Sequence, residues 1–168
     1  RLAQSFGPGM AARTADGTNS AAAFVNILSA HALSPDPGYG AFAASQAAAR
    51  SLSQTLRAEF SHSGLRMMNV YVGPIDDEWH QPLPPPKVAP SALARSIVNG
   101  LIEGLEDVYC GDVARDIARI RDVEARKAEG EIILYDVNRG WNRAQAVQVM
   151  RACESLNATF EQPCETLD

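Results

Sequence analysis

The stretch FVNILS at residues 24–29, followed by YGAFAASQAA at residues 39–48, decides the fold of this 168-residue chain. The first stretch lies inside a mostly apolar run, residues 23–30, whose length and composition predict a buried strand. The second begins a longer segment, residues 40–61, in which apolar side chains recur at the spacing of a helix. Residues 31–38 between them contain proline and glycine and predict a loop. A buried strand, a short loop and a long helix together indicate an α/β unit.

Strands and helices continue to alternate along the rest of the chain. The pattern predicts a strand at 66–72 ending at Gly73-Pro74, a proline-rich loop at 76–90, a helix with Ser91 as its N-cap, a strand at 107–111, a helix at 113–128, a strand at 131–136, a helix at 143–156 and a strand at 159–162. Upstream, residues 1–13 indicate the end of a helix interrupted at Gly7-Pro8-Gly9, followed by a polar loop at 14–20. The alternation predicts a mostly parallel sheet with flanking helices.

Composition restricts the partners and the environment of the chain. The formal net charge of −5 argues against binding to nucleic acid or to acidic membrane surfaces. No run of ~18 apolar residues predicts a transmembrane helix, and the N-terminus lacks a signal-peptide pattern. Cys110, Cys153 and Cys164 are odd in number and widely spaced, which favours reduced thiols over a disulfide framework. We therefore expect a cytoplasmic protein with no nucleic-acid or membrane partner.

Three positions after the first predicted strand form a frame with fixed spacing. Ser29 ends the strand, Phe42 follows thirteen residues later, and Gln46 follows four residues after that. This frame resembles the catalytic core of the short-chain dehydrogenases/reductases, in which a Ser, a Tyr and a Lys occupy the three positions. Residues 72–77 also resemble the family's Pro-Gly-x-x-x-Thr segment, which lies on the nicotinamide side of the cofactor. The resemblance covers residues 1–113 and implies the C-terminal half of a Rossmann-like fold.

The resemblance implies that the acid/base group of the family is missing. In the family the Tyr exchanges a proton with the substrate oxygen, and the Lys lowers the pKa of that Tyr and holds the cofactor ribose. A positioned acid or base is typically worth ~10²–10⁴-fold in rate, whereas Phe has no ionisable group and Gln has no charge. Neither Lys87 nor Lys127 follows a Tyr at the family's spacing. We therefore predict a site that is inactive in the family's reaction, with Ser29 as a relic.

Binding of NAD(P) is expected to be weak or absent. In dinucleotide folds the pyrophosphate is held by a glycine-rich turn that follows a strand, and this sequence has no such glycine motif in that setting. The residues that the resemblance implies for cofactor binding are Asn26, Gly73 and Ile75. Weak nicotinamide binding around Asn26, Ser29 and Gly73 stays open beside the hypothesis of no cofactor.

The last third of the sequence carries a different pattern. One predicted strand ends in Asp136-Val137-Asn138, and the last one leads into Glu161-Gln162-Pro163. These segments resemble the enolase superfamily, in particular its mandelate racemase-like and hydroxyproline-epimerase-like members. The resemblance covers residues 114–168 and implies a βαβ piece of a β/α barrel, in which Asp136 and Glu161 bind Mg²⁺ at the rim. The third carboxylate is expected on a strand beyond Asp168, and the family's Lys-x-Lys base does not occur in the sequence, so the site is expected to be incomplete.

Two functional hypotheses follow from these resemblances. The first is a catalytically inactive oxidoreductase-like protein that acts through subunit association. In the dehydrogenase family the helix corresponding to residues 40–61 lies in a dimer interface, which implies a homo-oligomer or a pair with a related active subunit. The alternative is a Mg²⁺-dependent racemase-, epimerase- or dehydratase-like site at Asp136 and Glu161, completed by another chain. A natural fusion, an engineered chimera and a fragment are all compatible with the two-part sequence.

Overall fold

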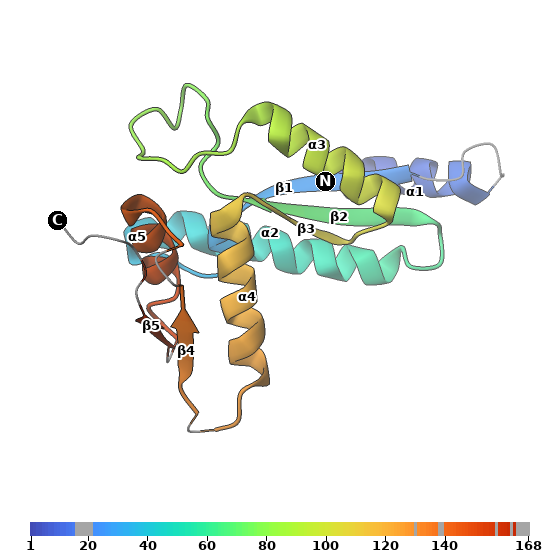
Figure 1. The fold of residues 1–168 in the computed structure, drawn as a ribbon. Coiled ribbons are helices and arrows are strands. Elements are labelled where there is room, and N and C mark those ends of the chain that lie inside the picture. The colour runs from blue at the N-terminus through green and yellow to red at the C-terminus, as the bar shows by residue number, and fades with distance from the viewer. Residues whose placement is uncertain (16–21, 130, 138–139, 157, 162, 164–168) are drawn as a thin grey trace.

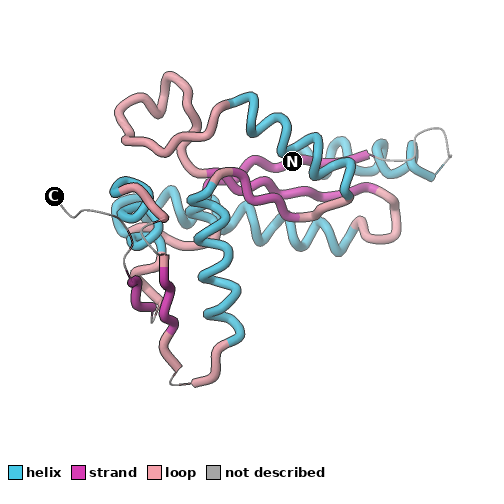
Figure 2. Tube along the Cα trace, viewed as in Figure 1, coloured by secondary structure: helices cyan, strands magenta, loops and turns pink. Residues whose placement is uncertain are grey.

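The computed structural model describes residues 1–15, 22–129, 131–137, 140–156, 158–161 and 163. Within them the chain forms a three-stranded sheet and a two-stranded sheet, both parallel and both flanked by helices (Figure 1). Figure 2 shows the alternation of strands, helices and loops along the trace. The predicted α/β class with parallel strands and flanking helices is confirmed.

The first sheet contains β1 (Ala22–Ser29), β2 (Leu65–Val72) and β3 (Asp107–Cys110) in the order β1-β2-β3. The central strand β2 is the most deeply buried, with one partly exposed side chain along its length. This burial on both faces explains its nearly continuous apolar sequence. The ends of the three strands are in register, because Ser29 pairs with Val72 and Val72 pairs with Cys110. Their carboxyl ends therefore meet at one edge of the sheet.

Two helices cover opposite faces of this sheet (Figure 1). On one face Met68, Val70 and Val72 of β2 pack with Leu93 of α3 (Pro90–Glu103). The intervening Asn69 lies toward the other face, where it bonds to Ser53 of α2 (Gly40–Glu59). This alternation is the two-residue period of a strand.

The buried face of α2 consists of small residues rather than large apolar ones. Ala43 and Ser53 are buried, whereas Phe42 is 47% exposed and Leu52 is 59% exposed. The Ser53 hydroxyl donates a hydrogen bond to Asn69 Oδ1 at 2.6 Å and accepts one from Asn26 Nδ2 at 3.0 Å. The sheet beneath this helix offers amide groups that need hydrogen bonds, and of the larger apolar side chains of the helix Leu56 is partly buried whereas Leu52 faces solvent.

The first helix, α1 (Leu2–Ala15), contacts β1 and β2 and continues through Pro8. The predicted interruption at Gly7-Pro8-Gly9 is therefore wrong. Proline removes one backbone donor without ending the helix, and Gly7 beside it lets the Phe60 ring approach, since a Cβ built on Gly7 would lie 2.6 Å from that ring. The predicted polar loop at 14–20 falls mostly outside the described residues.

The helix α3 starts differently from the prediction. Its N-cap is Ala89 rather than Ser91, and Pro90 is the first helical residue. Proline suits this position because its missing N–H would have had no helical partner. The long connection before it contains an isolated bridge between Ile75 and Val88 and leaves Trp79 89% exposed.

The remaining elements form a second unit with its own small sheet. These are α4 (Asp112–Arg126), β4 (Ile133–Asp136), α5 (Arg143–Ala152) and β5 (Ala158–Glu161). The order β4-α5-β5 with parallel pairing is the predicted βαβ piece. The helices of this unit share one apolar core with the first sheet, in which Leu28 and Tyr71 pack together with Ile117 and Val149.

Candidate functional site

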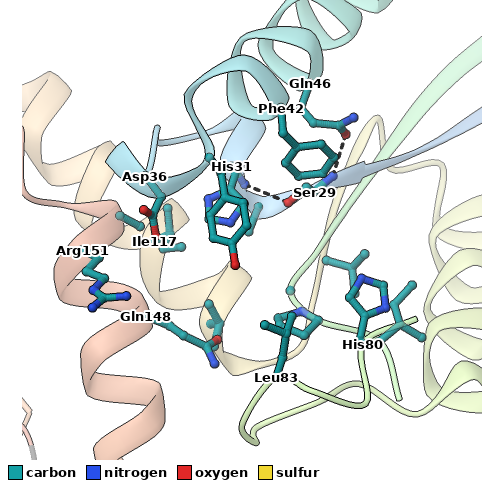
Figure 3. A pocket seen from close by; sticks show the side chains of 18 of the residues that line it. Ser29, His31, Asp36, Phe42, Gln46, His80, Leu83, Ile117, Gln148 and Arg151 are labelled. Carbon is teal, nitrogen blue, oxygen red and sulfur yellow. Dashed lines mark hydrogen bonds between the residues drawn. The ribbon is translucent and has the colours of Figure 1, made fainter. Parts of the chain in front are cut away.

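A cavity of about 1090 Å³ lies at the carboxyl ends of β1 and β2 (Figure 3). Ser29 and Val72, the last residues of the two strands, both line it. One wall is formed by the start of α2 and another by the connection after β2. In open parallel sheets, ligands bind outside the carboxyl ends of the strands, and this position makes the cavity the candidate site.

The Ser29–Phe42–Gln46 frame predicted from the sequence is brought together at this cavity. All three residues line it. The Oε1 atom of Gln46 accepts a hydrogen bond from the Ser29 backbone N–H at 3.0 Å, and the Ser29 hydroxyl accepts one from the His31 backbone N–H at 3.2 Å. Both bonds are drawn in Figure 3. The Gln46 side chain therefore holds the end of β1, and Ser29 caps the short 3₁₀ turn that follows it.

An aromatic cluster occupies the part of the cavity where the family's acid would lie. The His31 ring stacks on Tyr39 with centroids 5.3 Å apart and meets Phe42 edge-on at 6.1 Å. Burial lowers the pKa of His31, an effect that the nearby Asp36 carboxylate partly opposes. Its Nδ1 atom is buried without a hydrogen-bond partner among the described residues. The part of the cavity beside Phe42 therefore holds a neutral imidazole packed against two aromatic rings.

The residues predicted for cofactor binding do not all reach this cavity. Gly73 and Ile75 line it, whereas Asn26 is not among the lining residues. The Asn26 Nδ2 group donates to Ser53 at 3.0 Å and to Asn69 at 3.3 Å, which joins β1 to α2 and β2. The Asn26 amide is therefore committed to the interior, and its role toward a cofactor stays a prediction.

A further wall of the cavity comes from α5, in the second unit. Arg143, Val147, Gln148 and Arg151 line the cavity along one side of this helix. Figure 3 shows Gln148 and Arg151 extending from α5, with Leu83 and His80 on the opposite side. Neither arginine forms an ion pair or side-chain hydrogen bond within the described part of the chain. Sequence reasoning missed this wall, although the spacing of four, five and eight residues from Arg143 does place the set on one helical face.

A buried carboxylate holds α5 in place. Asp116 of α4, 8% exposed, accepts a hydrogen bond from Trp141 Nε1 at 2.8 Å and one from Gln145 Nε2 at 3.1 Å. At the start of α5, Asn142 caps the helix by accepting from the Gln145 backbone N–H at 2.9 Å. At its end, the Ser34 hydroxyl bonds to the Ala152 carbonyl. These contacts tie α5 both to α4 and to the loop after β1.

The predicted metal ligands Asp136 and Glu161 are direct neighbours on parallel strands. They pair in register at the carboxyl ends of β4 and β5, and both are exposed. Among the described residues no group of three or more His, Cys, Asp or Glu side chains is placed to hold a metal ion. The two carboxylates suit Mg²⁺ in kind, but the described residues do not complete its ligand set.

Comparison with known families divides the chain into the same two parts. The model of the short chain dehydrogenase family matches residues 2–87, and that of the enolase C-terminal domain-like family matches residues 87–168. The chain belongs to the short-chain dehydrogenase family. Both resemblances drawn from the sequence are confirmed. The two models meet at residue 87, whereas the division of the chain into units at 1–113 and 114–168 stays a prediction.

Two solved dehydrogenase structures resemble this family member over most of its length. One is a short chain dehydrogenase from Burkholderia cenocepacia J2315 in complex with NADP, at 30% identity and a TM-score of 0.63; the match covers 73% of this chain and 51% of that one. The other is a putative short-chain dehydrogenase from Novosphingobium aromaticivorans, at 16% identity and a TM-score of 0.60, covering 77% of this chain and 46% of that one. The chain thus spans about half the length of these structures.

A curated protein matches about half of the chain. It is a cis-3-hydroxy-L-proline dehydratase from Roseibium aggregatum, 32% identical over 83 residues, which are 48% of this chain and 23% of the dehydratase. The match therefore concerns less than a quarter of that enzyme. No helix among the described residues is long and apolar enough to cross a membrane.

We predict that Asp116→Ala lowers the free energy of unfolding by about 2–4 kcal/mol, because two buried donors lose their acceptor. Urea unfolding followed by circular dichroism measures this loss. The control is Asp122→Ala on the same helix. It removes an exposed carboxylate paired with Arg126 and should cost at most about 0.5 kcal/mol. Equal losses in the two variants would contradict the role given to Asp116.

Proposed function

We propose that this chain is a catalytically inactive member of the short-chain dehydrogenase family that acts by associating with another subunit. The observation that carries the proposal is the pair Phe42 and Gln46 at the positions of the family's acid and its Lys. The geometry supports it, because Gln46 is engaged with the Ser29 backbone and Phe42 packs against His31. Neither side chain can exchange a proton with a substrate oxygen or carry a positive charge toward a cofactor ribose.

The surroundings of Ser29 add to this argument. A proton donor at position 42 would work on a substrate held near Ser29, and a positioned donor of this kind is worth ~10²–10⁴-fold in rate. His31 lies beside Phe42, and its lowered pKa leaves it neutral at pH 7, when it could act only as a base. Its side chain is also turned into the Tyr39–Phe42 cluster. The phenol of that cluster, Tyr39, is not followed four residues later by a Lys, because Ala43 stands there.

We expect purified protein to show no oxidation of NADPH or NADH with a panel of aldehydes and ketones. We also expect neither cofactor to raise its melting temperature. A ligand that binds only the folded form adds ~2.7 kcal/mol to the free energy of unfolding when its concentration is 100 times its Kd. An unchanged melting temperature at such a concentration therefore indicates that the cofactor does not bind. The matched variant is Phe42→Tyr/Gln46→Lys. Turnover by this variant alone would attribute the inactivity to these two side chains, whereas turnover by the natural sequence would refute the proposal.

The exposed side of α2 supports association. Phe42 and Leu52 are 47% and 59% exposed, and Ala41, Ala48 and Ala49 of the same helix are exposed as well. Small residues permit another helix to approach closely, and exposed apolar side chains on one element favour an interaction site. A second copy of this chain or a related active subunit are the two partners that fit.

We predict that Leu52→Glu shifts the protein from dimer to monomer in sedimentation-velocity experiments, with a Kd for self-association at least about tenfold higher. A buried carboxylate at the interface would lose hydration without gaining a partner. Ile102→Glu is the control, because Ile102 lies on α3 and is 78% exposed. A monomeric natural sequence, both alone and with a related dehydrogenase subunit, would exclude association. Equal effects of the two variants would exclude α2 as its site.

A second candidate function is a Mg²⁺-dependent site of the enolase type. The in-register pair of Asp136 and Glu161 favours it, as do the match of the enolase C-terminal domain-like model to residues 87–168 and the similarity to a dehydratase. The described residues supply two carboxylates, so a third ligand and a base would have to come from another chain. Bound Mg²⁺ would act there as a Lewis acid on a substrate carboxylate.

For this second candidate, we predict that Mg²⁺ raises the melting temperature of the natural sequence and that Asp136→Ala abolishes the rise. Asp122→Ala, an acidic residue of α4 outside the pair, should leave the rise unchanged. Differential scanning calorimetry with and without 5 mM Mg²⁺ makes the comparison, the concentration being on the order of a weak site's Kd. If Asp136→Ala binds Mg²⁺ as well as the natural sequence does, this candidate fails.

A further inference from the structure

The cavity combines an extensive apolar lining with arginines that have no ion-pair partner among the described residues. Its apolar side chains come from both units of the chain: Leu28, Val72, Ile75, Leu83, Val113 and Ile117. Such a surface favours a ligand with an apolar body, since pockets of this kind bind mainly by burying apolar area. A volume of about 1090 Å³ is ample for a bicyclic aromatic molecule.

The charges on the cavity wall favour an anionic group on that ligand. Arg143 and Arg151 are exposed to the cavity from α5, and within the described residues neither has an ion-pair partner. The acidic residue on the wall is Asp36, which is 8% exposed and accepts from the Gly38 N–H at 2.8 Å. His80 is paired with Asp77 through its Nδ1 at 2.6 Å. Two unpaired guanidinium groups against one engaged carboxylate leave an excess of positive charge.

Two further polar atoms in the cavity lack partners. The Oε1 atom of Gln148 and the Nδ1 atom of His31 are buried and make no hydrogen bond in the described part of the chain. Buried polar groups are normally satisfied, so unsatisfied ones on the wall of a cavity indicate where a ligand or water would bond. Gln148 lies next to Arg151 on α5, whereas His31 lies across the cavity near Ser29.

We propose that this cavity binds an aromatic or otherwise apolar monocarboxylate, with Arg151 of α5 holding the carboxylate. A guanidinium offers two parallel N–H donors that match the two oxygens of a carboxylate. Gln148 lies three residues before Arg151 on α5, and its Nε2 group, rather than its Oε1 acceptor, would donate to the carboxylate, while the apolar body would extend toward Ile75 and Ile117. The proposal goes beyond the proposed function, because neither inactivity nor association requires a ligand.

The site depends on both parts of the chain. The floor at Ser29 and Gly73 lies in the segment that matches the dehydrogenase family, whereas Arg151 and Gln148 lie in the segment that matches the enolase-type family. A phosphorylated ligand would also pair with arginine, but the rest of the ligand would then lie against the apolar side chains of the cavity. A carboxylate on an apolar body is the simpler match to the groups present.

Isothermal titration calorimetry of the full chain tests the proposal. The probes are 2-naphthoate, its neutral amide 2-naphthamide, and inorganic phosphate. We expect the carboxylate to bind, the amide to bind about 10- to 100-fold more weakly, and phosphate alone not to compete with the carboxylate. A 10- to 100-fold difference in Kd between acid and amide corresponds to the loss of one charge-assisted hydrogen bond. Equal binding of acid and amide, competition by phosphate, or no binding of naphthoate up to millimolar concentration would overturn the proposal.

A pair of arginine variants locates the contact. Arg151→Gln should weaken naphthoate binding by about 10- to 100-fold and leave naphthamide binding unchanged. Arg95→Gln is the matched control: Arg95 is an exposed arginine of α3 that does not line the cavity, and its loss should leave both affinities unchanged. Because Arg151 is exposed and its side chain has no partner in the part of the chain that the structure describes, we expect both variants to melt at the temperature of the natural sequence. Equal weakening in both variants, or none in Arg151→Gln, would show that Arg151 does not hold the carboxylate.

Discussion

The bonds of the Asp116 carboxylate are the interaction on which the arrangement of the two units depends. The helix α4 starts two residues after β3 and carries Val113 and Ile117 to the cavity. One turn of the same helix presents Asp116 to Trp141 and Gln145, and this fixes α5 against α4. A buried carboxylate is costly unless its acceptors are used, and both donors here come from the segment that forms the far wall of the cavity. This anchor gives α5 its polar link to α4, beside the apolar core that the two helices share and the bond from Ser34 to the Ala152 carbonyl.

The carboxyl ends of β1 and β2 show a second constraint. The family's catalytic geometry is preserved in position, since Ser29, Phe42 and Gln46 still converge, but the bonds among them are now internal to the chain. Gln46 satisfies the backbone at the end of β1 and Ser29 satisfies the backbone of the following turn. These two bonds hold the end of β1 and the turn that follows it.

The sequence predicted the strands and their parallel class well, because β1 and β2 are buried runs whose composition alone identifies them. It also predicted that Asp136 and Glu161 would lie side by side, because equivalent ends of adjacent parallel strands meet. It did not identify the buried face of α2, because Ser53 on that face bonds to the amides of Asn26 and Asn69, which lie on other elements. It failed for the α5 wall for a related reason: the helical face of Arg151 is visible in the sequence, but the cavity that it borders depends on how two units pack.

The two tryptophans of this chain lie in opposite surroundings, at 89% exposure for Trp79 and 6% for Trp141. Trp79 lies in the connection that borders the cavity, whereas the indole of Trp141 is hydrogen-bonded to Asp116 and stacked on Tyr135 at 5.8 Å. The fluorescence emission of the two indoles should therefore differ in wavelength. The emission of Trp79 should be red-shifted and accessible to iodide, and that of Trp141 blue-shifted and protected. Each indole thus provides an intrinsic optical signal for one part of the molecule, and no external label is needed to follow the connection and the packed interior separately.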